Sequence, residues 1–393
     1  MSTRRRRGRK PPASSSAREA LSFDLLLEIV LRSDVTTVVR CAATGRILRR
    51  AILDPAFGRR LALQAAAADG GRFKFDPALL LAVSYHEFDY QSNTASYRII
   101  HAPDPATRRL ACLDATTIHP PWLRPLVARD GLFLHRCVYR SLGRITLHVV
   151  NTLTGHVTHP PQATLPEAYR RALLSSHAVR KASFVPPHHP QTNGVIFLDP
   201  AVVSRTIYWI YRRSGSRMNP EWRILALDVD AAQATKMDLP AGCVSSMMPY
   251  MDDKGDERLV DQHLLLASVR GRLNLFVMES IGISMWTLSP ATSGSAETWN
   301  RQLVIGAAEM LRQTGFVVYD NLARTPFNLE GFGERSGSMI LSLGCGQLFR
   351  LDHGITEEAT VVTRLISPGS VQVSGVFLHE TDRITLLKAM KFI

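Results

Sequence analysis

Hydrophobic positions follow two different periods along this 393-residue chain. Between residues 21 and 68 the apolar side chains recur at helical spacing, whereas from Leu79 onward short runs alternate apolar and polar residues as strands do. The pattern therefore predicts a multi-domain α+β chain with three parts. These are a disordered basic tail over residues 1–20, a small helical module over 21–70, and a large all-β domain over 71–393.

The first helix of the module has apolar residues on nearly every side, and they are Phe23, Leu25, Leu26, Leu27, Ile29, Val30 and Leu31. A surface helix normally carries a single apolar stripe, so this helix is expected to be covered on two sides. One side is expected to pack on other residues of the module, which are Val35, Val38, Val39, Ile47, Ala51 and Ile52. So small a cluster cannot cover the other side, which predicts a surface for a partner.

Local signals mark where two helices begin. Ser22 is expected to cap the first helix, and Asp24 places a favourable charge in its first turn. Asp54 followed by Pro55 predicts a second start, because aspartate caps well and proline fits the first helical position. The stripe of that helix is expected to be Phe57, Leu61, Ala65 and Ala68, with Gly70 and Gly71 ending it.

The β region is predicted to be a propeller or propeller-like domain rather than a sandwich. Strands are expected within residues 79–88, 96–102, 131–139, 144–151, 194–199, 205–213, 222–230, 263–280, 282–288, 314–321, 338–352 and 373–379. The expected strand pairs are 131–137 with 146–151, 206–212 with 224–230, 264–270 with 283–289, and 339–345 with 348–352. These units start roughly 50 to 75 residues apart, longer than a typical blade, so no blade count follows. One helical excursion is expected over 165–176.

The formal charge of +13 is concentrated at the N-terminus. Residues 1–18 carry +7, and the remaining 375 residues carry only +6. The tail fits nuclear import, a weak polyanion contact, or no role beyond solvated disorder. Nucleic-acid binding beyond a weak contact by the tail is therefore not expected.

Composition also bears on compartment. The five cysteines include no C-x-x-C pair, no apolar run approaches the length of a membrane span, and the N-terminus is polar. These features predict reduced thiols in a protein of the nucleus or cytoplasm, without membrane association.

The sequence contains no recognisable catalytic motif. It has neither a Walker A loop nor a G-x-S-x-G elbow, and His86 and His379 lack the second histidine that a zincin helix needs. We therefore expect no catalytic residue, no metal ion and no cofactor. Trp122, after two prolines, is a candidate target contact on a propeller face. Four other tryptophans are expected in the blade core, and they are Trp209, Trp222, Trp286 and Trp299.

The helical module resembles the F-box, by which substrate receptors dock onto the Skp-type adaptor of cullin–RING ubiquitin ligases. The matching residues are Leu21, Asp24, Leu25, Leu26, Glu28, Ile29, Arg40, Cys41, Ile52, Asp54, Pro55 and Phe57. Ser22 and Leu48 stand where the family has proline and tryptophan. The resemblance implies that the adaptor is contacted by Leu21, Leu25, Leu26, Ile29 and Leu48.

Several phrases of the β region are similar to the C-terminal associated domain of plant F-box proteins. They lie at residues 147–157, 224–240, 264–288 and 378–392. Together the two resemblances imply a non-catalytic substrate-recruiting subunit of an SCF-type ubiquitin ligase. Its partners would be a Skp-type adaptor, through it a cullin, and a target protein bound by the β domain.

Other interpretations of the same sequence stay open. The chain could be a propeller-type enzyme, a nucleic-acid-binding protein, or a receptor whose F-box no longer docks the adaptor. The helices could also simply cap the β domain.

Overall fold

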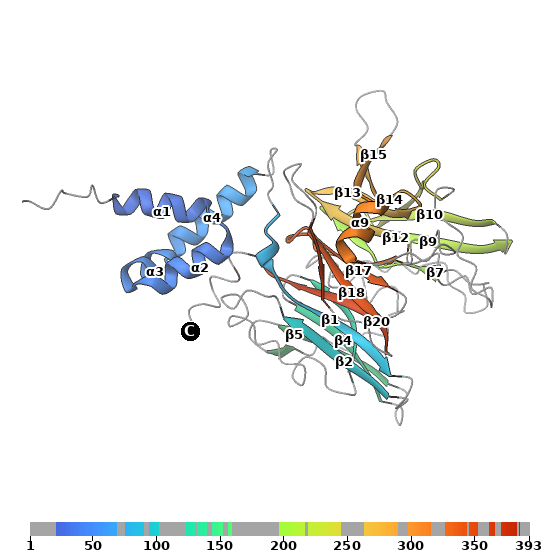
Figure 1. Ribbon diagram of the computed structural model, residues 1–393, viewed down its shortest axis with the longest axis horizontal. Coiled ribbons are helices and arrows are strands. Elements are labelled where there is room, and N and C mark those ends of the chain that lie inside the picture. Colours follow the sequence, from blue (N-terminus) through green and yellow to red (C-terminus); the bar gives the residue numbers. More distant parts are fainter. Residues whose placement is uncertain are drawn as a thin grey trace, which may run out of the picture.

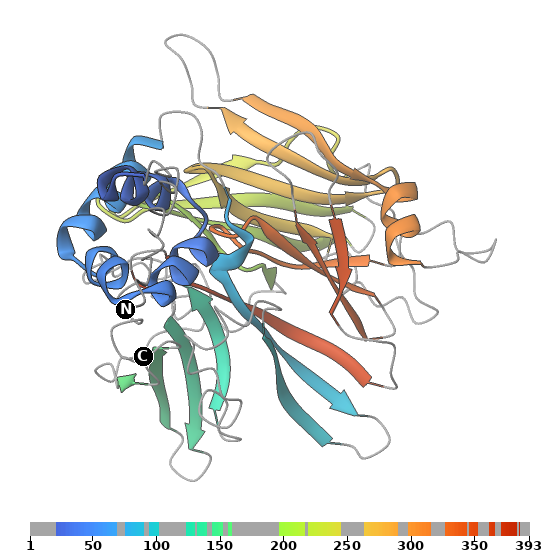
Figure 2. The same cartoon turned by 60° about the vertical axis from the view of Figure 1, so that its left-hand side comes forward.

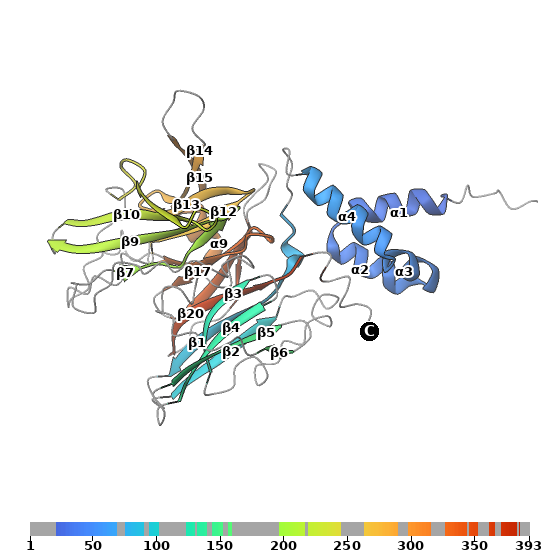
Figure 3. The ribbon, with the colours of Figure 1, turned by 180° about the vertical axis from the view of Figure 1, so that it is seen from behind.

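A computed structural model places a helical module beside a large β domain (Figure 1). It describes residues 21–68, 75–89, 94–101, 123–129, 132–139, 144–151, 156–158, 196–216, 219–244, 263–289, 298–315, 327–343, 346–352, 361–365, 371–382 and 385. Figures 2 and 3 show the first four helices together on one side of the β domain.

Four helices form the module, and they are α1 (Phe23–Arg32), α2 (Val35–Thr44), α3 (Arg46–Ile52) and α4 (Pro55–Ala68). The predicted caps are confirmed. Ser22 Oγ accepts a hydrogen bond from the Leu25 amide at 3.3 Å, and Asp54 Oδ1 accepts one from the Ala56 amide at 2.7 Å. Each cap satisfies a backbone donor that the helix itself leaves unpaired. The expected stop at Gly70 and Gly71 lies outside the described residues.

Strands of the described chain form five antiparallel sheets, which we call blades 1 to 5. Blade 1 is β2 (Thr94–His101), β1 (Leu80–Asp89) and β20 (Val371–Glu380). Blade 2 is β3 (Leu123–Arg129), β4 (Leu132–Tyr139), β5 (Arg144–Asn151) and β6 (Val157–Thr158). Blade 3 is β7 (Ile196–Phe197), β8 (Ala201–Val203), β9 (Thr206–Ser216), β10 (Asn219–Asp228) and β11 (Gln233–Asp238).

The remaining two blades have four strands each. Blade 4 is β12 (Leu264–Val269), β13 (Arg272–Glu279), β14 (Gly282–Ser289) and β15 (Thr298–Gly306). Blade 5 is β16 (Phe327–Phe332), β17 (Ser338–Leu343), β18 (Gln347–Asp352) and β19 (Val361–Arg364).

The blades are arranged radially, as in a propeller. Strand β12 contacts β8 and β16, and β20 contacts β16 and β3, so these innermost strands meet around a common axis. The β domain is therefore propeller-like with five blades, which confirms the predicted architecture. One predicted strand pair was wrong, because β13 lies between β12 and β14 and pairs with both.

The propeller closes through its first and last described strands. β20 pairs with β1, so one blade holds residues from both ends of the β domain. The buried carboxylate of Glu380 accepts hydrogen bonds from the amides of Ser336 (2.8 Å) and Arg335 (3.3 Å) in the β16–β17 turn. Burial raises the pKa of Glu380, an effect that these hydrogen bonds partly offset. The last strand is thus tied to blade 5 as well as to blade 1.

Apolar side chains fill the spaces between adjacent blades. Both faces of β13 are buried, with Leu275 and Val277 packing toward blade 3 and Phe276 and Met278 toward blade 5. A strand buried on both faces has no alternating pattern. The single run expected over 263–280 is two strands, because a turn at Arg270 and Gly271 separates β12 from β13.

A helix that the sequence analysis did not predict joins blade 4 to blade 5. Helix α9 (Ala307–Thr314) begins directly after β15 and ends at Gly315, which has a left-handed backbone. The strand expected over 314–321 is therefore wrong at its first residue, which is helical. Residues 316–321 and the helix expected over 165–176 lie outside the described residues.

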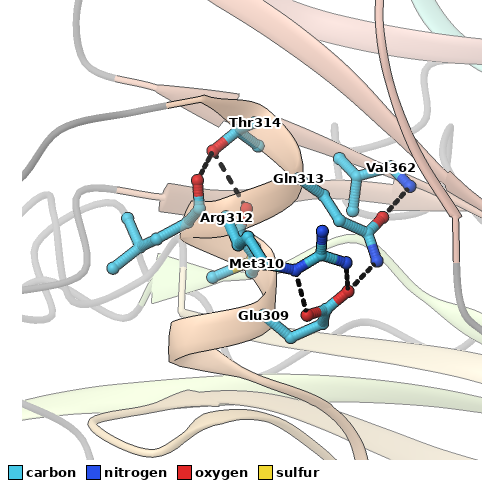
Figure 4. A network of polar contacts seen from close by, with 7 residues as sticks. Glu309, Met310, Arg312, Gln313, Thr314 and Val362 are labelled. Atoms are coloured by element: carbon cyan, nitrogen blue, oxygen red, sulfur yellow. Dashed lines mark hydrogen bonds and ion pairs between the residues drawn. The ribbon is translucent and has the colours of Figure 1, made fainter.

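Polar contacts fix α9 against the outer strand of blade 5 (Figure 4). Gln313 Oε1 accepts a hydrogen bond from the Val362 amide at 2.7 Å, and Arg364 donates to the Thr314 carbonyl at 2.8 Å. Hydrogen bonds from Arg312 and Gln313 lower the pKa of Glu309 to about 2. The Gln313 side chain thus satisfies a backbone N–H on the outward edge of β19, so that N–H is not available to another strand.

Candidate partner-docking site

Helix α1 buries one side and leaves the other exposed. Val30 and Leu31 are 1% and 5% exposed, whereas Leu21, Leu25 and Ile29 are 62%, 57% and 52% exposed. Leu25 and Ile29 are spaced four apart on the helix and therefore lie above one another, and Leu21 immediately precedes the N-cap Ser22. We call these three exposed residues the α1 face.

The two other predicted adaptor contacts lie deeper. Leu26 is half-buried, and Leu48 is half-buried with its side chain packed on the core that the helices share. Leu48 thus offers a partner less surface than the α1 face does. Ile47, expected inside the module, is instead 76% exposed. Helix α3 directs Leu48 and Ile52 inward, and the neighbouring residue Ile47 therefore points outward.

Further apolar side chains are exposed on the same module, and they are Phe23, Ile47 and Leu63. Leu63 was missed because the sequence analysis followed only the stripe of Phe57 and Leu61 on α4. An apolar residue two positions beyond Leu61 lies off that stripe, and this was the signal that could have identified it.

The helical module carries a net positive charge. Residues 21–68 contain seven arginines and four acids, a net charge of +3. Glu28 pairs with Arg32 on α1 and, at 2.5 Å, with Arg60 on α4, which ties the two helices together. An apolar face on a positively charged module fits a partner that combines an apolar groove with acidic groups.

The module is held firmly by the β domain. Val38 and Phe57 belong to one buried cluster with Leu81 of β1 and with Phe133 and Val150 of blade 2. The connection runs through the short helix η1 (Pro77–Leu79). The orientation of the α1 face relative to the blades is therefore set by a shared core rather than by a flexible linker.

The predicted target contact cannot be placed, because Trp122 lies outside the described residues. Trp209 and Trp222 are buried in the blade core as predicted, each 6% exposed. Trp286 and Trp299 are only half-buried, although both pack against the core between blades 3 and 4.

Two carboxylates interact near the axis of the propeller. Glu330 lies at a bulge of the innermost strand β16, and Asp199 lies between the innermost strands β7 and β8. Burial raises the pKa of Glu330, a 2.5 Å hydrogen bond from Ser342 Oγ opposes this, and the negative charge of Asp199 adds to the rise. Within the described residues, no three histidine, cysteine, aspartate or glutamate side chains are grouped to hold a metal ion.

The raised pKa of Glu330 predicts a pH-dependent stability. A carboxyl group whose folded pKa lies above its unfolded value of 4.5 is protonated more readily in the folded state. Stability is therefore lost as pH rises from about 4.5 through the folded pKa. Glu330→Gln keeps the acceptor for Ser342 but removes the charge, so the variant is expected to have a higher Tm than wild type at pH 8. Thermal unfolding at pH 5 and pH 8 checks this, and an equal Tm difference at both pH values would contradict it.

One known sequence family matches most of the β domain. The sequence family described as a domain of unknown function, DUF7595, matches residues 82–393. The chain belongs to this family. The match begins within β1, so the DUF7595 region comprises the propeller-like domain and excludes helices α1 to α4.

The chain was also compared with solved structures, and 13 of their chains match it. The β-propeller domain of Nup133 from Vanderwaltozyma polyspora shares 11% sequence identity, and the similarity covers 77% of this chain and 69% of that chain with a TM-score of 0.25. A TM-score this low does not establish a shared fold. The description of the DUF7595 region as propeller-like therefore rests on its own sheet topology. A search of curated proteins finds no match to the chain. Among the described residues, no helix is long and apolar enough to cross a membrane.

Proposed function

We propose that this chain is a non-catalytic substrate-recruiting subunit of a cullin–RING ubiquitin ligase. In this proposal the helical module is an F-box-like module that docks on a Skp-type adaptor and, through it, on a cullin. The propeller-like domain binds a target protein. The protein would act in the nucleus or cytoplasm, and it needs no cofactor because the transfer of ubiquitin takes place on other subunits.

The observation that carries the proposal is the exposure of the α1 face. Leu21, Leu25 and Ile29 stay more than half exposed although the opposite side of the same helix is buried. Exposing these side chains forgoes burial that would contribute about 1.5–3 kcal/mol for each one. A partner that covers them explains why the module keeps an apolar row on its surface.

The F-box likeness of this segment supports the identity of that partner. Ser22 replaces the family's proline and still caps the helix, so the start of α1 is preserved. Leu48 replaces the family's tryptophan and packs partly on the core, so contact with the adaptor would rest mainly on α1.

Titration of the purified full-length chain with a purified Skp-type adaptor tests this proposal. We expect saturable one-to-one binding by calorimetry, with an affinity that weakens as NaCl rises from about 0.05 to about 0.5 M, since the positive charge of the module would be screened. A titration without binding heat, repeated at two temperatures and confirmed by the absence of co-elution, would overturn the proposal.

A further inference from the structure

The outer strand of blade 4 has an edge with which no other described strand pairs. Strand β15 (Thr298–Gly306) pairs with β14 on one side, and Figures 1 and 2 show it at the rim of the β domain. Among the described residues, the backbone groups from Thr298 to Leu303 have no partner other than β14. A row of such donors and acceptors is a template for another strand.

Three of the other outer strands of the described chain carry protection that β15 lacks, whereas β2 of blade 1 resembles β15, because its one charged residue, Arg98, is paired with Glu87. The edge of β19 is engaged by the Gln313 side chain, and β6 is only two residues long. Strand β11 is six residues long and presents Lys236. Charges and short lengths of this kind prevent edge pairing. Strand β15 is nine residues long and has a single charged residue, Arg301.

Arg301 is not a free charge on this edge. Its guanidinium forms an ion pair with the buried carboxylate of Glu279 and lies 5.7 Å from the centre of the Trp286 ring. The pair leaves little net charge at the middle of the strand. A lysine or arginine on an edge strand normally opposes pairing with another strand through its charge. Here Glu279 offsets that charge.

The residue pattern of β15 is self-complementary in the antiparallel direction. If two copies meet with Arg301 at the centre, Trp299 of each copy faces Leu303 of the other on one side of the sheet. Asn300 then faces Gln302 on the opposite side. Apolar residues thus meet apolar residues and amides meet amides, and such cross-strand pairs stabilise sheets by about 0.2–1 kcal/mol each.

We propose that β15 is a homodimerisation edge, at which blade 4 of two copies joins into one continuous antiparallel sheet around a two-fold axis at Arg301. The half-exposed Leu303 supplies the apolar contact, and the open backbone groups supply the hydrogen bonds. A two-fold pairing of identical strands closes on itself and leaves no further edge for growth. This inference is independent of the ubiquitin-ligase proposal, because β15 and the α1 face lie on different parts of the chain.

Sedimentation velocity of the full-length chain tests the dimer. Between about 1 and about 100 μM the mass is expected to rise from 43.6 kDa toward twice that value. Leu303→Asp should weaken dimerisation at least about tenfold, whereas the matched variant Leu303→Val should retain it. Leu63→Asp, on the helical module, should also leave it unchanged. A monomer at every concentration, or loss of the dimer in the Leu63 variant alone, would overturn the proposal.

Cysteine cross-linking tests the register, and does so with variants that each change one exposed residue. Asn300→Cys and Gln302→Cys proteins are oxidised with diamide, which accepts the two electrons and two protons that the thiols release. A mixture of the two proteins should give a disulfide-linked dimer, because the two positions face each other. Each variant alone, and wild type with its native cysteines, should give none above background. Equal cross-linking in all samples, or none in the mixture, would contradict the register.

Discussion

The double variant Leu25→Asp, Ile29→Asp is expected to lose binding to a Skp-type adaptor by at least about a hundredfold, since truncated hot spots cost on the order of 2 kcal/mol each. Both side chains are more than half exposed and lie in one row on α1. Aspartate there would place two charges in a desolvated interface. Because neither residue contributes to the buried core, the fold is expected to persist. Calorimetric titration gives the affinity, and circular dichroism checks the fold.

A matched control separates the α1 face from general surface effects. The variant Asp24→Ala, Arg32→Ala alters two polar positions of the same helix, and its affinity is expected to fall no more than a few-fold, as is typical of residues outside hot spots. Wild-type affinity in the Leu25, Ile29 variant would remove this face from the proposed interface. Equal loss in both double variants would mean that α1 as a whole, rather than its apolar row, is required.

Phe133→Ala is expected to destabilise the chain by about 3–5 kcal/mol. The ring is fully buried, and it contacts the rings of Phe377 at 5.5 Å and His379 at 4.9 Å between centroids. It also belongs to the core shared with Val30 and Leu31 of α1. Its truncation leaves a cavity where blade 1, blade 2 and the helical module meet.

Urea unfolding followed by circular dichroism measures this loss. The exposed Phe23 provides the control, because Phe23→Ala removes the same ring from the surface and is expected to cost less than about 1 kcal/mol. Since helices and blades share the core, the helical and strand signals are expected to change in one transition. Separate transitions, or a loss below about 1 kcal/mol for Phe133→Ala, would contradict the shared core.

Features set by neighbouring residues could be predicted from the sequence. The cap at Ser22 and the helix start at Asp54 and Pro55 depend on contacts within three residues, so they follow from local patterns. Strand pairs joined by short turns, such as β4 with β5 and β17 with β18, were predicted for the same reason.

Features set by distant residues could not be predicted. The pairing of β1 with β20 joins residues almost three hundred positions apart, and no local pattern specifies it. Helix α9 is only eight residues long and lies between strands, and its cap at Gly315 was the one available signal. Which of Ile47 and Leu48 points inward depends on the start of α3, which the sequence analysis did not fix.

The candidate site was predictable in part. Exposure of Leu25 and Ile29 followed from an apolar pattern too wide for so small a module to cover. The exposure of Leu63 could not be predicted in this way, because Leu63 lies off the main apolar stripe of α4. The β domain was predicted to be propeller-like from its many short strands and their repeated pairs, whereas its five blades emerge only from the sheet topology.

The central claim is that the α1 face attaches this chain to a ubiquitin ligase. Affinity capture of the intact, tagged protein from cells, with quantitative mass spectrometry, tests it most directly. The wild-type chain is predicted to bring down a Skp-type adaptor and a cullin in stoichiometric amounts, and the Leu25, Ile29 variant is predicted to bring down neither. Capture of wild type without adaptor or cullin, under conditions that retain a known receptor's complex, would contradict the claim.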